Sequence, residues 1–186
     1  FCNSRLKGKD NGSYIKRIDI IERELRYNWE KYGIYQYRLL DDTFNDNEEK
    51  LDSFLAAVKR LDFTPTLWCY ARLDLFYNKL HRVDKLFDMG LRSVYLGIET
   101  LNRRTGLAVG KGMHAHKGIE TVQKIYEKYH NDLQIRGNFI VGLPYENQDS
   151  IMNTVNLILS GELPLHHARF TPLKILRNAN WWSSDI

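Results

Sequence analysis

Two apolar patterns alternate along this chain. Apolar residues recur at the three- and four-residue spacing of an amphipathic helix in segments 15–29, 51–58, 80–87, 119–129 and 151–159. Short runs rich in β-branched and aromatic residues, typical of strands, follow at 35–40, 66–73, 93–98, 134–142 and 168–173. This alternation predicts an α/β fold with a parallel sheet and right-handed crossovers, either an open doubly wound sheet or a partial or complete barrel.

Glycines mark the expected ends of three helices. Gly33, Gly90 and Gly161 each follow a helical segment, where a left-handed residue lets the chain turn toward the next strand. Because the sequence starts with a helix, we expect a strand ahead of residue 1, so the sheet formed by these residues would lack its first strand.

The composition is that of a single domain over residues 1–186. Hydrophobic residues make up 43% of the chain and no low-complexity tract interrupts it, so we expect it to fold throughout. The formal charge of +4 favours an anionic partner only slightly, because basic and acidic residues are interspersed. Two cysteines are too few for a disulfide scaffold and no apolar run reaches the length of a bilayer span, which predicts a cytoplasmic protein without a membrane partner.

Polar residues follow each of the expected strands. In parallel α/β folds the carboxyl ends of the strands lie on one rim, where ligands bind. We expect this rim to collect Asp41, Asp42, Arg72, Asp74, Glu99, Thr100, the run GLPYE at 142–146, and Thr171 to Lys174. One aspartate at such a position is usually a helix cap. Polar residues at five strand ends would be costly to bury together, so we expect this rim to be open to water or to bind a zwitterion.

Four segments, in order, give the chain a family resemblance. They resemble segments of the radical S-adenosylmethionine (SAM) superfamily. The first runs from FCNSRLKGK to YQYRLLDDTF, and the others are YARLD, MGLRSVYLGIETLNRRTGLAVGKG and GNFIVGLPYENQDS. The similar branch includes tRNA methylthiotransferases and cobalamin-associated members. Each segment alone is a weak signal, whereas four at family-like spacings over nearly the whole chain are a strong one. The resemblance implies a partial (β/α)6 TIM-like barrel.

The resemblance also implies cofactors. The family's Cys-x3-Cys-x2-Cys loop usually has an aromatic residue before its last cysteine, and Phe1-Cys2 matches that pair. Cys2 would then be one of three thiolate ligands of a [4Fe-4S] cluster, with the other two ahead of residue 1, so the chain alone would be inactive. SAM would bind the open iron and yield a 5′-deoxyadenosyl radical that modifies a substrate. A cobalamin cofactor, held by a further domain, stays open.

Residues at the strand ends match the family's SAM contacts. They are Asp41 and Asp42 for the amino group, Lys111 and Arg72 for the carboxylate, Glu99 and Thr100 for the ribose or polar tail, and Ile140, Val141 and Gly142 for the adenine. An acid suits an ammonium group, and a guanidinium fork suits a carboxylate.

Two other functions remain open from the sequence. An aldolase-type barrel would use Lys174, at a strand end, as a Schiff-base amine. A non-catalytic relative would bind SAM or a partner without a cluster. The substrate is equally open among small molecules, peptides and RNA, and a radical enzyme would also need a low-potential electron donor. Cys69, within LWCYA, is expected to be a buried, inert thiol.

Overall fold

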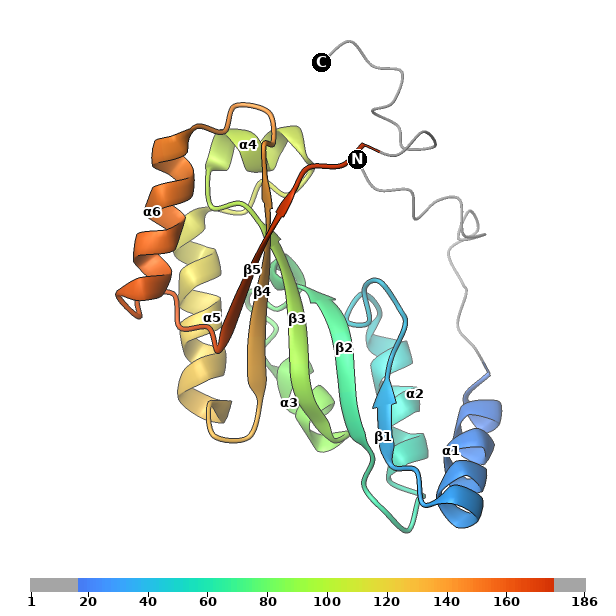
Figure 1. The fold of residues 1–186 in the computed structure, drawn as a ribbon. Coiled ribbons are helices and arrows are strands. Elements are labelled where there is room, and N and C mark those ends of the chain that lie inside the picture. The colour runs from blue at the N-terminus through green and yellow to red at the C-terminus, as the bar shows by residue number, and fades with distance from the viewer. Residues whose placement is uncertain (1–16, 176–186) are drawn as a thin grey trace.

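The structure, a computed structural model, describes residues 17–175 and contains one five-stranded sheet. Its strands are β1 (Gln36–Arg38), β2 (Thr66–Arg72), β3 (Leu91–Glu99), β4 (Gln134–Val141) and β5 (His167–Pro172). All neighbouring pairs are parallel and follow chain order, β1-β2-β3-β4-β5 (Figure 1). A doubly wound sheet reverses its strand order, whereas this one curls in one direction into a half-barrel. The predicted parallel α/β fold is confirmed, as a partial barrel.

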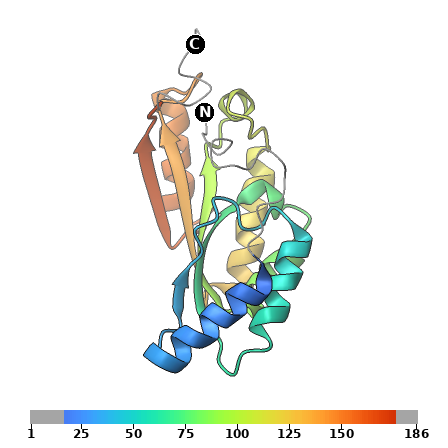
Figure 2. The ribbon, with the colours of Figure 1, turned by 90° about the vertical axis from the view of Figure 1, so that its right-hand side faces the viewer.

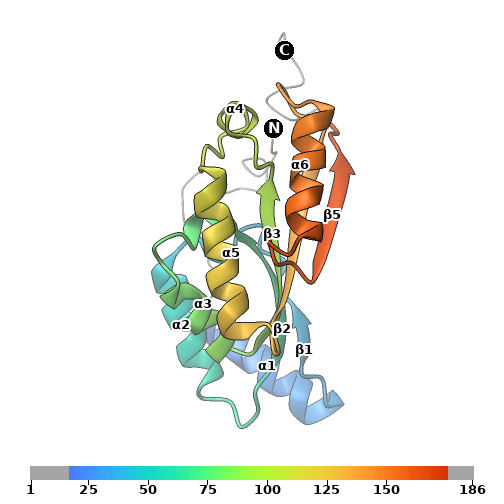
Figure 3. The same ribbon diagram turned by 90° about the vertical axis from the view of Figure 1, so that its left-hand side faces the viewer.

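Helices cover one face of the half-barrel (Figures 2 and 3). They are α1 (Ile18–Tyr32), α2 (Glu48–Val58), α3 (His81–Asp88), α4 (Arg103–Ala108), α5 (Ala115–Tyr129) and α6 (Gln148–Leu159), with a 3-10 turn η2 (Leu73–Leu75). The other, concave face of the sheet carries no helix within residues 17–175. Across that same range, the helices are too short or too polar to serve as membrane spans.

Strand β2 shows how the sheet divides its side chains between the two faces. Leu67, Cys69 and Ala71 are buried under the helices, while Trp68 and Tyr70 alternate with them and lie on the concave face. This period of two follows from the pleat of a strand. Burial raises the pKa of the Cys69 thiol to about 12, so the prediction of an inert core cysteine is confirmed.

The three predicted glycine turns are all present. Gly33, Gly90 and Gly161 have φ angles of 64°, 97° and 78°, which suit glycine and are costly for other residues. At Gly90 a side chain is also excluded by space, because an added Cβ would lie 1.9 Å from the backbone oxygen of Pro65. This close approach brings the turn after α3 against the start of β2.

Several elements differ from the sequence prediction. β1 pairs with β2 over three residues only, although the apolar run suggested 35–40, and Leu40 beyond it is 81% exposed. The short helix α4 was not predicted because six residues are too few to show a period; its start is set by the Asn102 side chain, which accepts a hydrogen bond from the Thr105 amide. Ile15 and the strand expected ahead of residue 1 lie outside the described residues.

Candidate active site

The carboxyl ends of the strands meet on one rim, as a parallel sheet requires. The sequence-predicted residues on it are Asp41 and Asp42 after β1, Arg72 at the end of β2, Glu99 and Thr100 at the end of β3, Ile140, Val141 and Gly142 at the end of β4, and Lys111 in the loop between α4 and α5. The structure divides them into a central group around Glu99 and two outer groups that already have protein partners.

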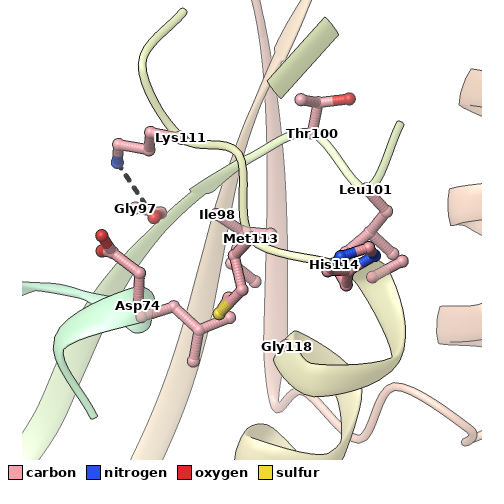
Figure 4. Close-up of a pocket in the computed structure, with 11 residues that line it drawn as sticks. Asp74, Gly97, Ile98, Thr100, Leu101, Lys111, Met113, His114 and Gly118 are labelled. Carbon is pink, nitrogen blue, oxygen red and sulfur yellow. Dashed lines mark hydrogen bonds between the residues drawn. The ribbon is translucent and has the colours of Figure 1, made fainter. Parts of the chain in front are cut away.

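Glu99 and Lys111 form an ion pair at the centre of the rim. Lys111 Nζ lies 2.8 Å from Glu99 Oε1. It donates a second hydrogen bond to the Gly97 carbonyl at 3.1 Å (Figure 4). The two side chains are only 17% and 15% exposed, so water screens their attraction weakly. Glu99 has a φ of 65°, an uncommon conformation for a residue other than glycine. The backbone therefore turns at this residue, and the β3–β4 register shifts beside it.

Two glycines make room for this pair. A Cβ at Gly97 would lie 2.9 Å from Glu99 Oε1 and 3.0 Å from Lys111 Nζ, so a larger residue would displace the pair. A Cβ at Gly106, in α4, would lie 2.8 Å from the Lys111 backbone oxygen. Helix α4 and the loop that carries Lys111 are thus folded tightly against each other, which fixes where the ammonium reaches the sheet.

A cavity of about 20 Å³ adjoins the Lys111 side of this pair (Figure 4). It is lined by Asp74, Thr100, Lys111, Met113 and His114, among others, and lies between η2, the end of β3 and the start of α5. A second cavity of about 10 Å³ brings Glu99 and Thr100 together with Ile140 and Val141. The predicted contacts for the polar tail and for the adenine are therefore neighbours across β3 and β4.

Arg72 is held by an acid on its own chain segment. Its guanidinium donates to both oxygens of Asp74, at 3.0 and 2.6 Å, and this hydrogen bonding raises the pKa of Arg72 against the effect of burial. The buried side chain of Asn45 bonds both the N–H and the C=O of Arg72, at 3.0 and 2.9 Å. A carboxylate ligand at Arg72 would have to compete with Asp74. Nothing in the sequence singled out Asn45.

The two aspartates after β1 have different surroundings. Asp41 accepts hydrogen bonds from the Thr43 amide and from the ammonium of Lys50, each at 3.0 Å. Lys50 is almost buried and also contacts Asp46. Asp41 thus anchors the loop between β1 and α2. Asp42 is exposed on that loop.

The turn after β4 is closed by its own glutamate. Gly142 has a φ of 88° and donates its N–H to the Glu146 carboxylate at 2.7 Å. Tyr145 follows with a φ of 65°, and the Arg104 guanidinium lies 4.0 Å from the centre of its ring. This contact ties α4 to the β4 turn across the rim. Arg104 and Tyr145 lie far apart in the sequence, and only the tertiary arrangement brings them together.

Two residues predicted from the sequence, Cys2 and Lys174, bear on the cofactor and on the rival function. Cys2, the predicted iron ligand, lies outside the described residues. Within residues 17–175 no group of three or more histidine, cysteine or acidic side chains is arranged to hold a metal ion. Lys174, the Schiff-base candidate, is exposed beyond the end of β5 and lacks the burial that would activate an amine nucleophile.

Comparison with known proteins identifies the family. Residues 1–158 match the Radical SAM superfamily, so the chain belongs to that superfamily and the resemblance read from its four segments is confirmed. It is also similar to an uncharacterized methyltransferase of Pyrococcus horikoshii, with 30% identity over 173 residues that cover 92% of this chain and 36% of the relative.

Solved structures share the half-barrel. The radical SAM methyltransferase TsrM of Kitasatospora setae, solved with cobalamin and a [4Fe-4S] cluster, superposes with a TM-score of 0.71 at 15% identity, over 90% of this chain and 33% of that one. Coproporphyrinogen III oxidase of Escherichia coli gives 0.67 at 15% identity, over 86% and 37%. Archaeal Elp3 of Methanocaldococcus infernus gives 0.58 at 14%, over 84% and 42%. At these identities the likeness shows the fold alone. The chain spans 36% of the length of the Pyrococcus horikoshii relative and 33% of that of TsrM.

Proposed function

We propose that residues 1–186 form the SAM-binding core domain of a radical SAM enzyme. The observation that carries this proposal is the Glu99–Lys111 pair, an acid and a base 2.8 Å apart and mostly shielded from water on the carboxyl rim of a radical SAM half-barrel. The methionine part of SAM carries an ammonium and a carboxylate, whose charges are opposite to those of Glu99 and Lys111 respectively. A [4Fe-4S] cluster held by Cys2 and two further cysteines would supply the electron that cleaves bound SAM.

The chain's own residues bind and orient SAM in this proposal. Glu99 takes the ammonium and Lys111 the carboxylate, so that each charge exchanges its protein partner for a ligand partner and stays paired. Thr100 contacts the ribose or polar tail. Ile140 and Val141 flank the adenine, and open space beside Gly142 lets a ring approach the backbone.

The outer residues take secondary roles. Arg72 keeps N–H donors beyond the two it gives to Asp74, but its charge is already paired, which makes it the secondary candidate for the SAM carboxylate. Asp41 shapes the loop after β1 through Lys50, and Asp42, exposed on the same loop, is a further candidate for a contact with the amino group.

Methyl transfer is the reaction class that we propose. The support is the Pyrococcus horikoshii relative, which is named a methyltransferase and is 30% identical. A cobalamin cofactor would be held by a domain outside this chain, as the match to about a third of TsrM allows. The reaction also requires a low-potential electron donor, and we place the protein in the cytoplasm.

Two rival functions make different predictions. The Schiff-base enzyme would gain covalent mass when borohydride is added with a carbonyl substrate, and the exposure of Lys174 argues against it. A non-catalytic SAM-binding relative would bind SAM but hold no iron. Protein that includes the whole cysteine loop, purified without oxygen, separates these outcomes by its iron content and by its products from SAM.

Substitutions at the rim test the site. We expect Glu99→Gln and Lys111→Met to weaken SAM binding by about tenfold or more, because each loses roughly one charge-assisted contact. Glu120→Gln, in the exposed Glu120–Lys124 pair on α5, is the matched control and should leave the SAM affinity unchanged. A colourless, iron-free protein that never cleaves SAM would refute the enzyme, and equal SAM affinity in all three variants would refute the site.

A further inference from the structure

A cluster of arginine and tyrosine side chains lies on the concave face of the sheet, below the rim. It consists of Arg38 from β1, Tyr70 from β2, Tyr95 from β3 and Arg136 from β4, and we call it the arginine–tyrosine stack. Tyr70, Tyr95 and Arg136 are register partners on adjacent parallel strands, so their side chains project from the same face. No described helix covers this face.

The members of the stack hold one another in place. The Tyr70 and Tyr95 ring centres are 5.1 Å apart, and the Arg38 guanidinium carbon lies 5.1 Å from the first and 6.0 Å from the second. The Arg136 guanidinium carbon lies 5.4 Å from the Tyr95 ring centre. Two guanidinium groups therefore flank one tyrosine ring. Arg38 also donates a hydrogen bond to the Tyr70 hydroxyl.

The positive charge of the stack is not neutralised by the described part of the chain. Neither Arg38 nor Arg136 forms an ion pair among residues 17–175, whereas Arg60, Arg72 and Arg82 each contact a carboxylate at 2.6 to 2.7 Å. Arg136 donates hydrogen bonds to two neutral partners, Ser93 Oγ at 3.1 Å and Gln134 Oε1 at 2.9 Å. Each guanidinium has five N–H donors, so both keep donors for a ligand.

The same face offers further positive charge and little negative charge. Arg169, on β5, adds a positive charge; it is exposed and lies in register with Asn138, and the exposed His167 lies in register with Arg136. Glu99 is the one acidic residue at the concave-face positions of the described strands, and it sits at the rim and is bonded to Lys111. An anion on this face therefore meets arginines and aromatic rings without repulsion from a carboxylate.

We propose that the arginine–tyrosine stack binds an oxyanion of the substrate, a phosphate or a carboxylate group on a small molecule. Guanidinium groups recognise both oxyanions through paired hydrogen bonds, and rings beneath them hold their planes in place. Two guanidiniums around one ring suit a single multiply charged group better than the long run of phosphates in RNA. That this anion belongs to the substrate depends on the function proposed above.

The position of the stack sets the size of that substrate. Tyr95 precedes Glu99 by four residues along β3, which places the stack on the order of 10 Å below the SAM contacts on the rim. A substrate anchored here must carry its reacting atom about that far from its anionic group. Small anions without such an extension would bind the stack but would not be modified.

Anion titration tests this proposal without SAM or cluster. Pyrophosphate serves as the phosphate probe, citrate as the carboxylate probe and a ten-nucleotide single-stranded uridine RNA as the nucleic-acid probe. We expect pyrophosphate or citrate to bind. Arg38→Gln/Arg136→Gln should weaken that binding by about a hundredfold, because it loses roughly two charge-assisted contacts at about tenfold each. Arg92→Gln is the control, because Arg92 also lies over a ring, that of Phe87 at 4.6 Å, but outside the stack.

The variants are read together with the SAM affinity and the fold. The single variants Arg38→Gln and Arg136→Gln carry the test if the double variant fails to fold, and Arg38→Lys/Arg136→Lys should retain part of the affinity. Equal anion binding by wild type and the glutamine variants would overturn the proposal, as would binding of the RNA with no binding of either small anion. If the wild type does not bind SAM, the proposed function is refuted, but the anion titration still shows whether the arginine–tyrosine stack binds an oxyanion.

Discussion

The Glu99–Lys111 pair allows a direct test of how burial, rather than distance, sets the strength of an ion pair in this protein. The exposed pair Glu120–Lys124 on α5 is closer, at 2.5 Å against 2.8 Å, but its side chains are about half exposed, whereas those of Glu99 and Lys111 are 15% and 17% exposed. Distance alone would make the helical pair the stronger one. Screening by water predicts the reverse order.

Expected magnitudes follow from these exposures. Lys111→Met leaves the Glu99 carboxylate mostly buried without its donor, which should cost about 1–3 kcal/mol in the free energy of unfolding. For a chain of this size that lowers Tm by about 2–4 °C per kcal/mol. The coupling energy between Glu99 and Lys111 should be about 1–2 kcal/mol. The coupling between Glu120 and Lys124 should be clearly smaller, because both side chains of this helical pair are exposed to water.

Two double-mutant cycles measured by urea unfolding give these energies. One uses Glu99→Gln, Lys111→Met and their combination, and the other uses Glu120→Gln, Lys124→Met and theirs. Unfolding is followed by circular dichroism at low salt and again at high salt, where the exposed coupling should fall further than the buried one. The reasoning is refuted if the Glu99–Lys111 coupling is no larger than the Glu120–Lys124 coupling.

Three further predictions concern the core and the helical face. Hydrogen bonding to Lys85 lowers the pKa of Glu48 to about 2 from an ordinary value of 4.5, so the stability that the Glu48 carboxylate contributes is present above about pH 4.5 and is lost as the pH falls toward 2. The Tm difference between wild type and Glu48→Gln should shrink over that range, and a constant difference would contradict this prediction. Cys69 should resist thiol reagents at pH 8 and react in urea, as peptide mapping would show, and labelling in the native state would count against its burial. Gly90→Ala should destabilise the protein by roughly 3 kcal/mol or more, against about 1–2 kcal/mol for Gly33→Ala, where an added Cβ meets nothing within 4 Å; equal losses in denaturant unfolding would show that the contact with Pro65 yields easily.

Local patterns in the chain were enough to predict the architecture. Helical spacing and strand-like runs alternate, and each pattern depends on neighbours a few residues away, so the parallel sheet, its covering helices and the turns at Gly33, Gly90 and Gly161 could be predicted. The rim could be predicted as well, because parallel strands place all their carboxyl ends together. Short elements such as α4 escaped, since six residues show no period.

Contacts between distant segments could not be read in the same way. The pairing of Lys111 with Glu99 is one such contact, because it forms only when α4 packs on its own loop through Gly106 and brings the ammonium to the carboxylate. Arg72 looks available until Asp74 is seen to occupy its guanidinium. Partner choice depends on which side chains the curvature of the sheet brings within about 3 Å, and no local pattern encodes that distance.

The concave face is the clearest case of this division. Alternation along each strand is a property of the sequence, and it already separates buried from exposed positions. Which arginine then meets which tyrosine depends on the register between strands that lie more than twenty residues apart in the chain. The two guanidiniums of Arg38 and Arg136 lie around the Tyr95 ring only because strand pairing and sheet curvature bring residues from separate strands together.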